Sequence, residues 1–235
     1  MAYGLTSREL RSLQMEHRVA AVSLSANDVS PARRRMRDFQ DAIKGLPPGT
    51  PVAYWDAGDV VFQNDLSGLW KLVESHPDKL LVAAEADKVD RTDGVMAHWI
   101  QSISDSGCRE EVLSLLCGEY ILNSGFAAGT VRTLTEYLLH ADVLRDSELL
   151  AGSTDWGDQV ALNIYCRSDP DRFLEIDSTW NYVPFGRSDP GARFTKDGYY
   201  QCWGRTVNVV HGAGGSLWNV PGYQEFCDDP FKQFS

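Results

Sequence analysis

The sequence has no segment expected to enter or cross a membrane. No apolar run approaches the roughly 20 residues that span a bilayer, and the opening MAYGLTSREL lacks the apolar core of a targeting signal. The five cysteines form no CxxC pair and no close Cys/His cluster. Because an odd number of scattered cysteines without a secretory signal favours reduced thiols, we expect a cytoplasmic protein.

The chain also lacks a surplus of positive charge. Its 22 Lys and Arg residues stand against 33 Asp and Glu, for a net charge of −11. Such a chain has no basic excess to neutralise phosphates, so we expect no nucleic-acid partner. An anionic small-molecule substrate stays possible, since a bound cation inverts the local field. Repeats, low-complexity tracts and linkers are missing too, so residues 1–235 are expected to form a single domain.

Short apolar segments alternate with helical patterns along the chain. Helices are expected over 5–17, 30–46, 66–76, 94–104, 109–116, 130–144 and 155–168. Strands are expected over 18–25, 51–56, 79–87, 119–130 with a bend, 172–184 and 205–214. This alternation predicts an α/β domain with a mostly parallel sheet covered by helices on both faces. Because the pattern opens on a helix, the first β–α unit of a doubly wound sheet has no counterpart in it.

The stretch YWDAGDVVF places two carboxylates at the end of an expected strand. Asp56 and Asp59 are separated by two residues, one of which is Gly58. Ligands of open α/β sheets lie beyond the carboxyl ends of strands, and hard divalent cations prefer carboxylate oxygens. Asp and Gly are also common in plain turns. Both interpretations, a metal-binding loop and an acidic turn, stay open at this point.

A histidine and three glycines follow the last expected strand. His211 ends VNVVH and is followed by Gly212, Gly214 and Gly215. Imidazole ligates Mn²⁺-like metals, and glycine-rich backbone can approach phosphate oxygens closely. The alternative is a loop histidine beside a turn. HGAGG is also similar to the oxyanion segment of esterases, but the sequence has no GxSxG nucleophile motif.

Two further polar motifs interrupt apolar segments. YILNSGFAAG puts Asn123 and Ser124 at a bend, where they either bind sugar hydroxyls or cap a β-bulge. TDWGDQVALN puts Asp155, Asp158 and Gln159 near a helix start. N-capping alone explains acidic residues there, and a carboxylate that faces a reacting sugar explains them equally well.

Two other groups of residues have a structural interpretation first. The arginine-rich run 33–37 is expected to be a solvated helix face, although one guanidinium could reach a pyrophosphate. The aromatic residues Trp180, Tyr182, Trp203 and Trp218 are more often core residues than platforms for a sugar or base.

Taken together, these motifs form an ordered set between about Val52 and Trp218. A strand with DxxD, then LNSG, then DQxxLN, then a late strand ending in HG with glycines resembles the GT-A glycosyltransferases. The DxxD form with a downstream histidine is most similar to the glycosyltransferase domain of procollagen lysyl hydroxylases, and more distantly to glycogenin-type transferases. The resemblance implies a single GT-A, Rossmann-like domain.

The resemblance also implies roles for individual residues. Asp56, Asp59 and His211 match the ligands of Mn²⁺ or Mg²⁺. Asp158 and Gln159 match the catalytic pair, and the implied substrate-binding residues are Asn123, Ser124, Gly125, Gly212, Gly214, Gly215, Trp180 and Asn181. The last two belong to DSTWNYVP, which is similar to the segment that shapes the acceptor side. The lysine that many relatives carry after the histidine is missing, which leaves the diphosphate to the metal and an arginine.

The activity implied is that of a metal-dependent hexosyltransferase. A sugar would pass from a nucleotide-sugar donor, expected to be a UDP-sugar, to a glycan, protein or small-molecule acceptor, with retention of anomeric configuration. One alternative is a degenerate module that binds a sugar nucleotide without turnover. A metal-dependent sugar-nucleotide pyrophosphorylase or phosphohydrolase is a weaker alternative, because the sequence shows no basic, glycine-rich phosphate loop.

Overall fold

The structure is a computed structural model of the whole chain. It describes residues 2–3, 21–22, 31–56, 60–155, 158–184, 191–196, 199–202, 204–213 and 220–221. Within these ranges no helix has both the length and the apolar character needed to cross a membrane. The four cysteines they include are all free: Cys108, Cys117, Cys166 and Cys202.

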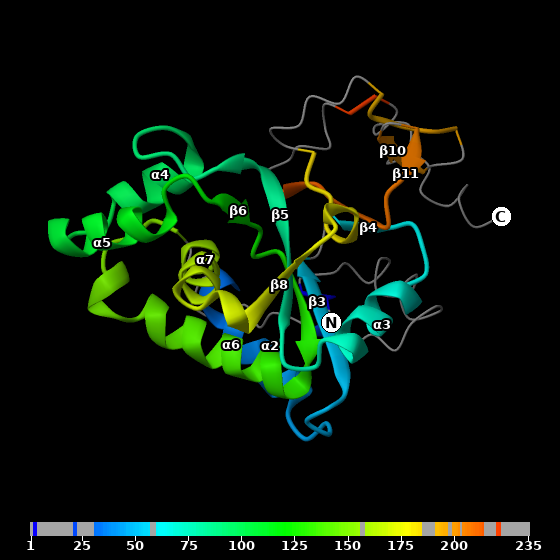
Figure 1. Cartoon of the computed structure of the whole chain (residues 1–235), viewed down its shortest axis with the longest axis horizontal. Coiled ribbons are helices and arrows are strands. Elements are labelled where there is room, and N and C mark those ends of the chain that lie inside the picture. Colours follow the sequence, from blue (N-terminus) through cyan, green and yellow to red (C-terminus); the bar gives the residue numbers. More distant parts are fainter. Residues whose placement is uncertain are drawn as a thin grey trace.

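A seven-stranded mixed sheet forms the centre of the molecule (Figure 1). Its order is β2-β1-β3-β7-β5-β6, and β8 also pairs with β5. The strands β1, β2, β3, β5 and β8 run in one direction, and β6 and β7 run against them. The expectation of an α/β domain with a mostly parallel, mixed sheet is therefore confirmed.

Most expected elements appear close to their predicted bounds. The helices are α2 Pro31–Ile43, α3 Ser67–Ser75, α4 Gly94–Gln101, α5 Ser106–Leu116, α6 Val131–Arg145 and α7 Gln159–Ser168. The strands of the large sheet are β1 Ala2–Tyr3, β2 Ala21–Val22, β3 Pro51–Asp56, β5 Leu80–Lys88, β6 Tyr120–Leu122, β7 Phe126–Thr130 and β8 Phe173–Ile176.

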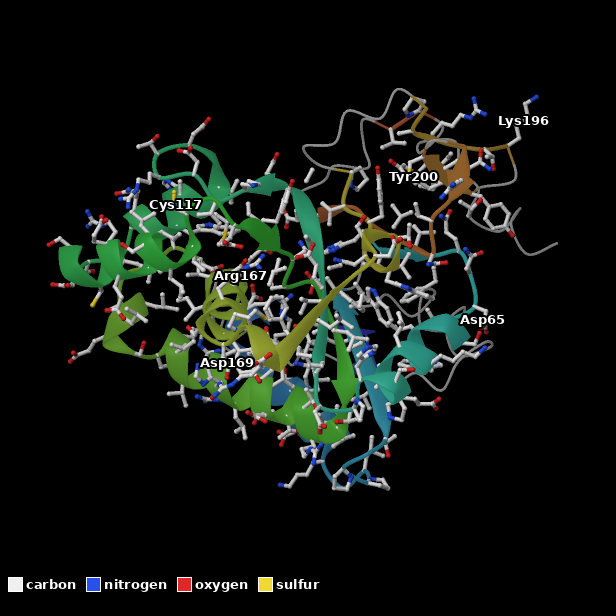
Figure 2. All side chains as sticks on the ribbon, viewed as in Figure 1. Asp65, Cys117, Arg167, Asp169, Lys196 and Tyr200 are labelled. Carbon is white, nitrogen blue, oxygen red and sulfur yellow. The ribbon has the colours of Figure 1, made fainter. Side chains whose placement is uncertain are left out.

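The sheet separates two hydrophobic cores, because successive strand side chains point to opposite faces. On β5, Leu80 and Val82 pack with helices α2, α4, α5, α6 and α7. Leu81 and Ala83 pack in the other core, which includes Leu69 of α3. Side chains fill the space between the sheet and the helices on both faces (Figure 2). Both faces are covered, as the continuous apolar runs of the strands predicted.

The start of the chain differs from the sequence-based expectation. A strand that the pattern did not predict, β1, lies between β2 and β3 and is parallel to both. The strand has two residues, Ala2–Tyr3, which are too few for periodicity to register. The strand β2 falls inside the predicted segment 18–25, and the helix expected over 5–17 lies outside the described residues.

The described strands after residue 184 belong to two small sheets and not to the large one. Here β12 Val209–His211 pairs antiparallel with β4 Val60–Phe62, and β9 Arg193–Phe194, β10 Tyr200–Cys202 and β11 Arg205–Thr206 form a three-stranded sheet. Side chains of β9, β10 and β12, among them Tyr200, form a separate hydrophobic core (Figure 2). Of these strands, β11 and β12 fall inside the predicted segment 205–214, and β4, β9 and β10 were not predicted. No local pattern could supply their partners, which for β4 and β12 are distant in sequence.

Candidate functional site

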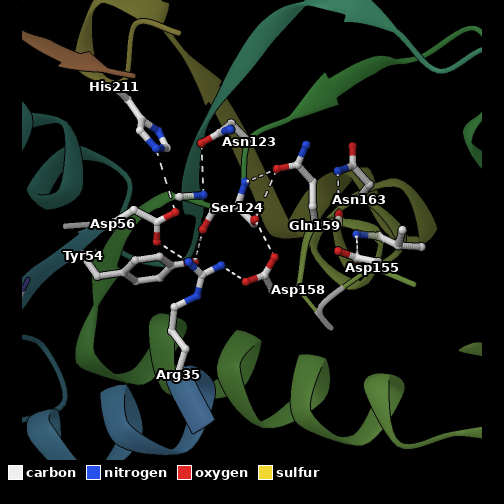
Figure 3. Close-up of polar contacts among 12 residues, drawn as sticks. Arg35, Tyr54, Asp56, Asn123, Ser124, Asp155, Asp158, Gln159, Asn163 and His211 are labelled. Carbon is white, nitrogen blue, oxygen red and sulfur yellow. Dashed lines mark hydrogen bonds and ion pairs between the residues drawn. The ribbon is translucent and has the colours of Figure 1, made fainter. Parts of the chain in front are cut away.

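Polar side chains from five elements gather at one edge of the large sheet (Figure 3). Asp56 ends β3, and its backbone N–H donates to the carbonyl of Gly125 (2.8 Å) at the bend between β6 and β7. The same bend carries Asn123 and Ser124, and α7 begins beside it with Gln159. The structure therefore brings together residues that the sequence placed in three separate motifs.

His211 reaches this edge through the β4–β12 pair. It lies opposite Val60 in the register, and its side chain is 2% exposed. Its Nε2 is 3.9 Å from Oδ2 of Asp56. Asp59, the third expected metal ligand, lies outside the described residues. Among the residues that are described, no three His, Cys, Asp or Glu side chains are grouped to hold a metal.

Gly125 makes the approach of Asp56 and His211 possible. A Cβ at this position would lie 2.2 Å from Cε1 of His211 and 2.9 Å from both Oδ2 of Asp56 and Oδ1 of Asn123. Real Cβ atoms do not come so close to other heavy atoms. The glycine was expected to give room to a ligand, and in the structure it gives room to these three side chains.

Arg35 of α2 links the two carboxylates of the site. Its guanidinium pairs with Oδ1 of Asp56 and Oδ2 of Asp158. Burial acts to lower the pKa of Arg35, but Asp56 and its other neighbours raise it above the usual value, so the side chain is a permanent cation. The expectation that the whole run 33–37 is solvated is wrong for Arg35, which is 8% exposed, and holds for the exposed Arg37.

The two aspartates before α7 have different roles. Asp155 accepts a hydrogen bond from the backbone N–H of Val160 (2.6 Å) through Oδ2, as a helix cap does. Asp158 makes no cap bond. Instead its Oδ1 accepts from Oγ of Ser124 (2.8 Å), while Oδ2 meets Arg35. The capping interpretation is therefore confirmed for Asp155. For Asp158, the interpretation as a carboxylate that faces a reacting sugar stays a prediction.

Ser124 is fixed from several sides. Its backbone N–H and its Oγ both approach Oε1 of Gln159, at 3.2 and 3.3 Å. Its carbonyl accepts from the hydroxyl of Tyr54 (3.1 Å). Burial raises the pKa of Tyr54 to about 12, so this hydroxyl keeps its proton at physiological pH. The bend is thus held by hydrogen bonds that survive across the ordinary pH range.

Glu85 is a member of the site that sequence reasoning missed. Its Oε1 accepts from Nδ2 of Asn123 (2.7 Å) and from Nε2 of Gln159 (3.1 Å). Oδ1 of Asn123 in turn accepts from the N–H of Gly125 (3.0 Å) and Nδ2 of Asn181 (2.9 Å). The sequence does hold a sign of Glu85, because it is the first charged residue after the apolar run LLVAA.

The remaining predicted site residues lie apart from this network or outside the described chain. Trp180 packs in the hydrophobic core, where a Cβ added at Gly68 of α3 would lie 3.0 Å from its ring, and its carbonyl accepts from Nε1 of Trp55. Gly212 is buried directly after His211. Gly214 and Gly215 lie outside the described residues, as do Trp203 and Trp218.

The two described metal-ligand candidates fit a divalent cation. A carboxylate oxygen and an imidazole nitrogen from two different strands face each other, and Mn²⁺ accepts this donor set more readily than Mg²⁺ does. The second oxygen of Asp56 belongs to Arg35. Oδ2 of Asp56 thus faces His211 and does not pair with Arg35, as the binding of one cation by both side chains would require.

Comparison with known proteins identifies the fold. No family model matches the chain, and no curated protein sequence matches it significantly. Mouse xyloside xylosyltransferase 1, in its apo form, is similar over 89% of this chain and 81% of its own, at 16% identity and a TM-score of 0.50. The galactosyltransferase LgtC, in complex with donor and acceptor sugar analogs, is similar over 96% of this chain and 81% of its own, at 15% identity and a TM-score of 0.50. The chain therefore has the fold of GT-A-type glycosyltransferases.

Proposed function

We propose that this protein is a metal-dependent glycosyltransferase that moves a sugar from a UDP-sugar to an acceptor. The observation that supports this most is the convergence of Asp56, His211 and Asp158 beside the Asn123–Gly125 bend, at the strand edge of a glycosyltransferase fold. In such sheets ligands lie beyond the carboxyl ends of the strands. The DxxD-type resemblance to lysyl hydroxylase and glycogenin-type domains points the same way.

Asp56 and His211, with Asp59, would hold Mn²⁺. When bound, the cation would stabilise the negative charge that develops on the diphosphate leaving group. The late glycines would let the backbone approach the phosphates. Arg35, which already reaches both carboxylates, is the arginine placed to supply positive charge where relatives have a lysine.

Asp158 and Gln159 would serve the reacting sugar. As the bond to the diphosphate breaks, positive charge develops at the anomeric carbon, and the carboxylate of Asp158 would stabilise it. Ser124 holds Oδ1 of Asp158 in place, and Arg35 holds Oδ2. Because Arg35 balances its charge, Asp158 can stay ionised in a buried position. Retention of configuration is the outcome that the resemblance favours.

The proposal is tested by UDP release from UDP-glucose, UDP-galactose and UDP-xylose, with water or added saccharides as acceptors. We expect release that depends on Mn²⁺ and stops with EDTA. Asp59→Ala and His211→Ala should lose it, while Asp171→Ala, which removes an exposed surface carboxylate, should not. Unchanged turnover in both site variants would refute the metal assignment. Tight UDP binding without release would favour the non-catalytic alternative.

A further inference from the structure

Glu85 determines how the side-chain amides of Asn123 and Gln159 are oriented. A carboxylate only accepts hydrogen bonds, so the side chains of Asn123 and Gln159 must both turn their NH₂ groups toward Oε1 of Glu85. An amide has only two orientations about its last bond. One carboxyl oxygen therefore sets the orientation of two side chains from two different segments.

The opposite ends of both carboxamides are already occupied. Oδ1 of Asn123 accepts from the backbone N–H of Gly125 and from Nδ2 of Asn181, which fills its acceptor capacity. Oε1 of Gln159 accepts from the backbone N–H of Ser124, whose one hydroxyl hydrogen goes at the shorter distance to Asp158. Both carbonyl oxygens thus face donors of the protein itself. In the described contacts, the second N–H of each carboxamide remains for a ligand.

Nothing in the packing explains a carboxylate here. Burial raises the pKa of Glu85, which means that the surroundings disfavour its charge, and the hydrogen bonds from Asn123 and Gln159 offset this only in part. Its described hydrogen-bond partners are neutral amides, and not a Lys or Arg. A partly buried charge whose pKa is raised in this way costs stability, and such groups gather at functional sites.

We propose that Glu85 is a positioning residue that makes Asn123 and Gln159 offer N–H donors, and not acceptors, to the oxygen atoms of a bound sugar. The matching acceptor is Oδ1 of Asn181, which is buried and has no hydrogen-bond partner among the described residues. The site would then present two donors and one acceptor to sugar hydroxyls. This inference rests on the proposed function and specifies how that site recognises its donor.

The competing role for Glu85 is chemical. Glu85 also lines a cavity of about 380 Å³ with Tyr120, Glu175 and Asp177, where β8 diverges from β5. An acceptor hydroxyl that entered there could give its proton to the carboxylate. The two roles differ in what they require, because positioning needs an oxygen that accepts two hydrogen bonds and proton transfer needs a base.

Two variants separate these roles. Glu85→Met keeps the length of the side chain and removes the acceptor, so kcat for the UDP-sugar should fall by about 10- to 100-fold, with a smaller change in KM. Glu85→Gln keeps a carbonyl oxygen that can accept from both amides, so it should recover most of the lost kcat. If Glu85→Gln is as inactive as Glu85→Met, or if Glu85→Met is as active as wild type, the proposal is wrong.

A second measurement does not depend on turnover. In ¹⁵N-labelled protein without donor, the side-chain NH₂ signals of Asn123 and Gln159 should move in Glu85→Met and stay near their wild-type positions in Glu85→Gln. Signals that are unchanged in Glu85→Met would overturn the proposal even if the protein released no UDP. Loss of UDP release in the wild type with these shifts present would instead count against the proposed function.

Discussion

The two halves of the candidate site are held together by different forces. In the charged half, Arg35 of α2 forms ion pairs with Asp56 of β3 and with Asp158 at the start of α7, and His211 of β12 lies 3.9 Å from Asp56. In the amide half, hydrogen bonds of 2.7–3.1 Å join residues from β5, the β6–β7 bend, the segment after η3 (Ser178–Trp180) and α7: Glu85, Asn123, Asn181 and Gln159.

This difference separates what can rearrange from what is already in place. The guanidinium of Arg35 has further N–H donors and already bridges two carboxylates, so it can redistribute its contacts when a cation and a diphosphate bind beside it. Carboxamide hydrogen bonds are directional, and the oxygen only accepts while the NH₂ group only donates. We therefore expect the charged half to adjust when the donor binds, and the amide half to keep its geometry.

The largest effect should come from the charge of Asp158. Asp158→Asn keeps the size of the side chain but removes the carboxylate opposite the developing positive charge, so kcat for UDP release should fall by about 10²- to 10³-fold. Asp155→Asn, three residues earlier, keeps a capping oxygen and should change kcat little. Equal losses of kcat in the two variants would show that the carboxylate of Asp158 does not act on the reacting sugar.

Loss of Arg35 should destabilise the fold. Arg35→Met leaves the buried Asp158 and the half-buried Asp56 without their cation, which should lower the free energy of unfolding by about 3 kcal/mol in urea titrations. Arg37→Met, in the same helix, removes a side chain that is 63% exposed and should cost well under about 1 kcal/mol. If both variants unfold at the same urea concentration, Arg35 does not neutralise the site.

Gly125→Ala should disturb the place where the two halves meet, because the new methyl group would clash with His211 and Asp56 of the charged half and with Asn123 of the amide half. The new methyl group would have to push His211 away from Asp56, which should cost about 1–3 kcal/mol of stability and weaken Mn²⁺ binding. Gly129→Ala lies in β7, the strand that follows this bend, where a Cβ meets only ordinary contacts at 3.5 Å, and serves as control. Calorimetric titration with Mn²⁺ would detect the difference, and equal affinities would contradict the geometry.

The smallest effect should be the contribution of Glu85 to the pH dependence of the free energy of unfolding. Burial raises its pKa in the folded state, so as pH rises the unfolded chain loses this proton first, and wild type becomes less stable. Relative to Glu85→Gln, wild type should therefore lose stability above the ordinary glutamate pKa and regain it in acid. Urea titrations from pH 4 upward test this, with Glu136→Gln on the exposed side of α6 as control. A pH-independent difference would contradict the raised pKa.

Local patterns predicted the parts of the site that lie on single segments. An apolar run that ends in a carboxylate placed Asp56 at the end of β3, and NSG between two apolar segments placed the β6–β7 bend. Arg35 could also have been found. It lies beside Met36 and Phe39 on the buried face of α2, four residues before Phe39, so helical periodicity turns it inward.

The contacts between distant segments could not be predicted. The β4–β12 pair joins residues about 150 positions apart and brings His211 to Asp56, and no periodicity specifies such a partner. The antiparallel direction of β7 likewise follows from its pairing with β3 and β5. The role of Glu85 depends on amides from two other segments, so its identity alone, in an apolar strand, could mark it only as unusual.

The central claim is that Asp56 and His211 hold a cation that anchors a UDP-sugar. It is tested most directly by calorimetric titration of UDP into the protein with Mn²⁺, with EDTA, and into Asp56→Ala with Mn²⁺. The account predicts that UDP binds at least about tenfold more tightly with Mn²⁺ than with EDTA, and that Asp56→Ala loses this difference. Equal affinity under all three conditions, or no binding in any of them, would contradict it.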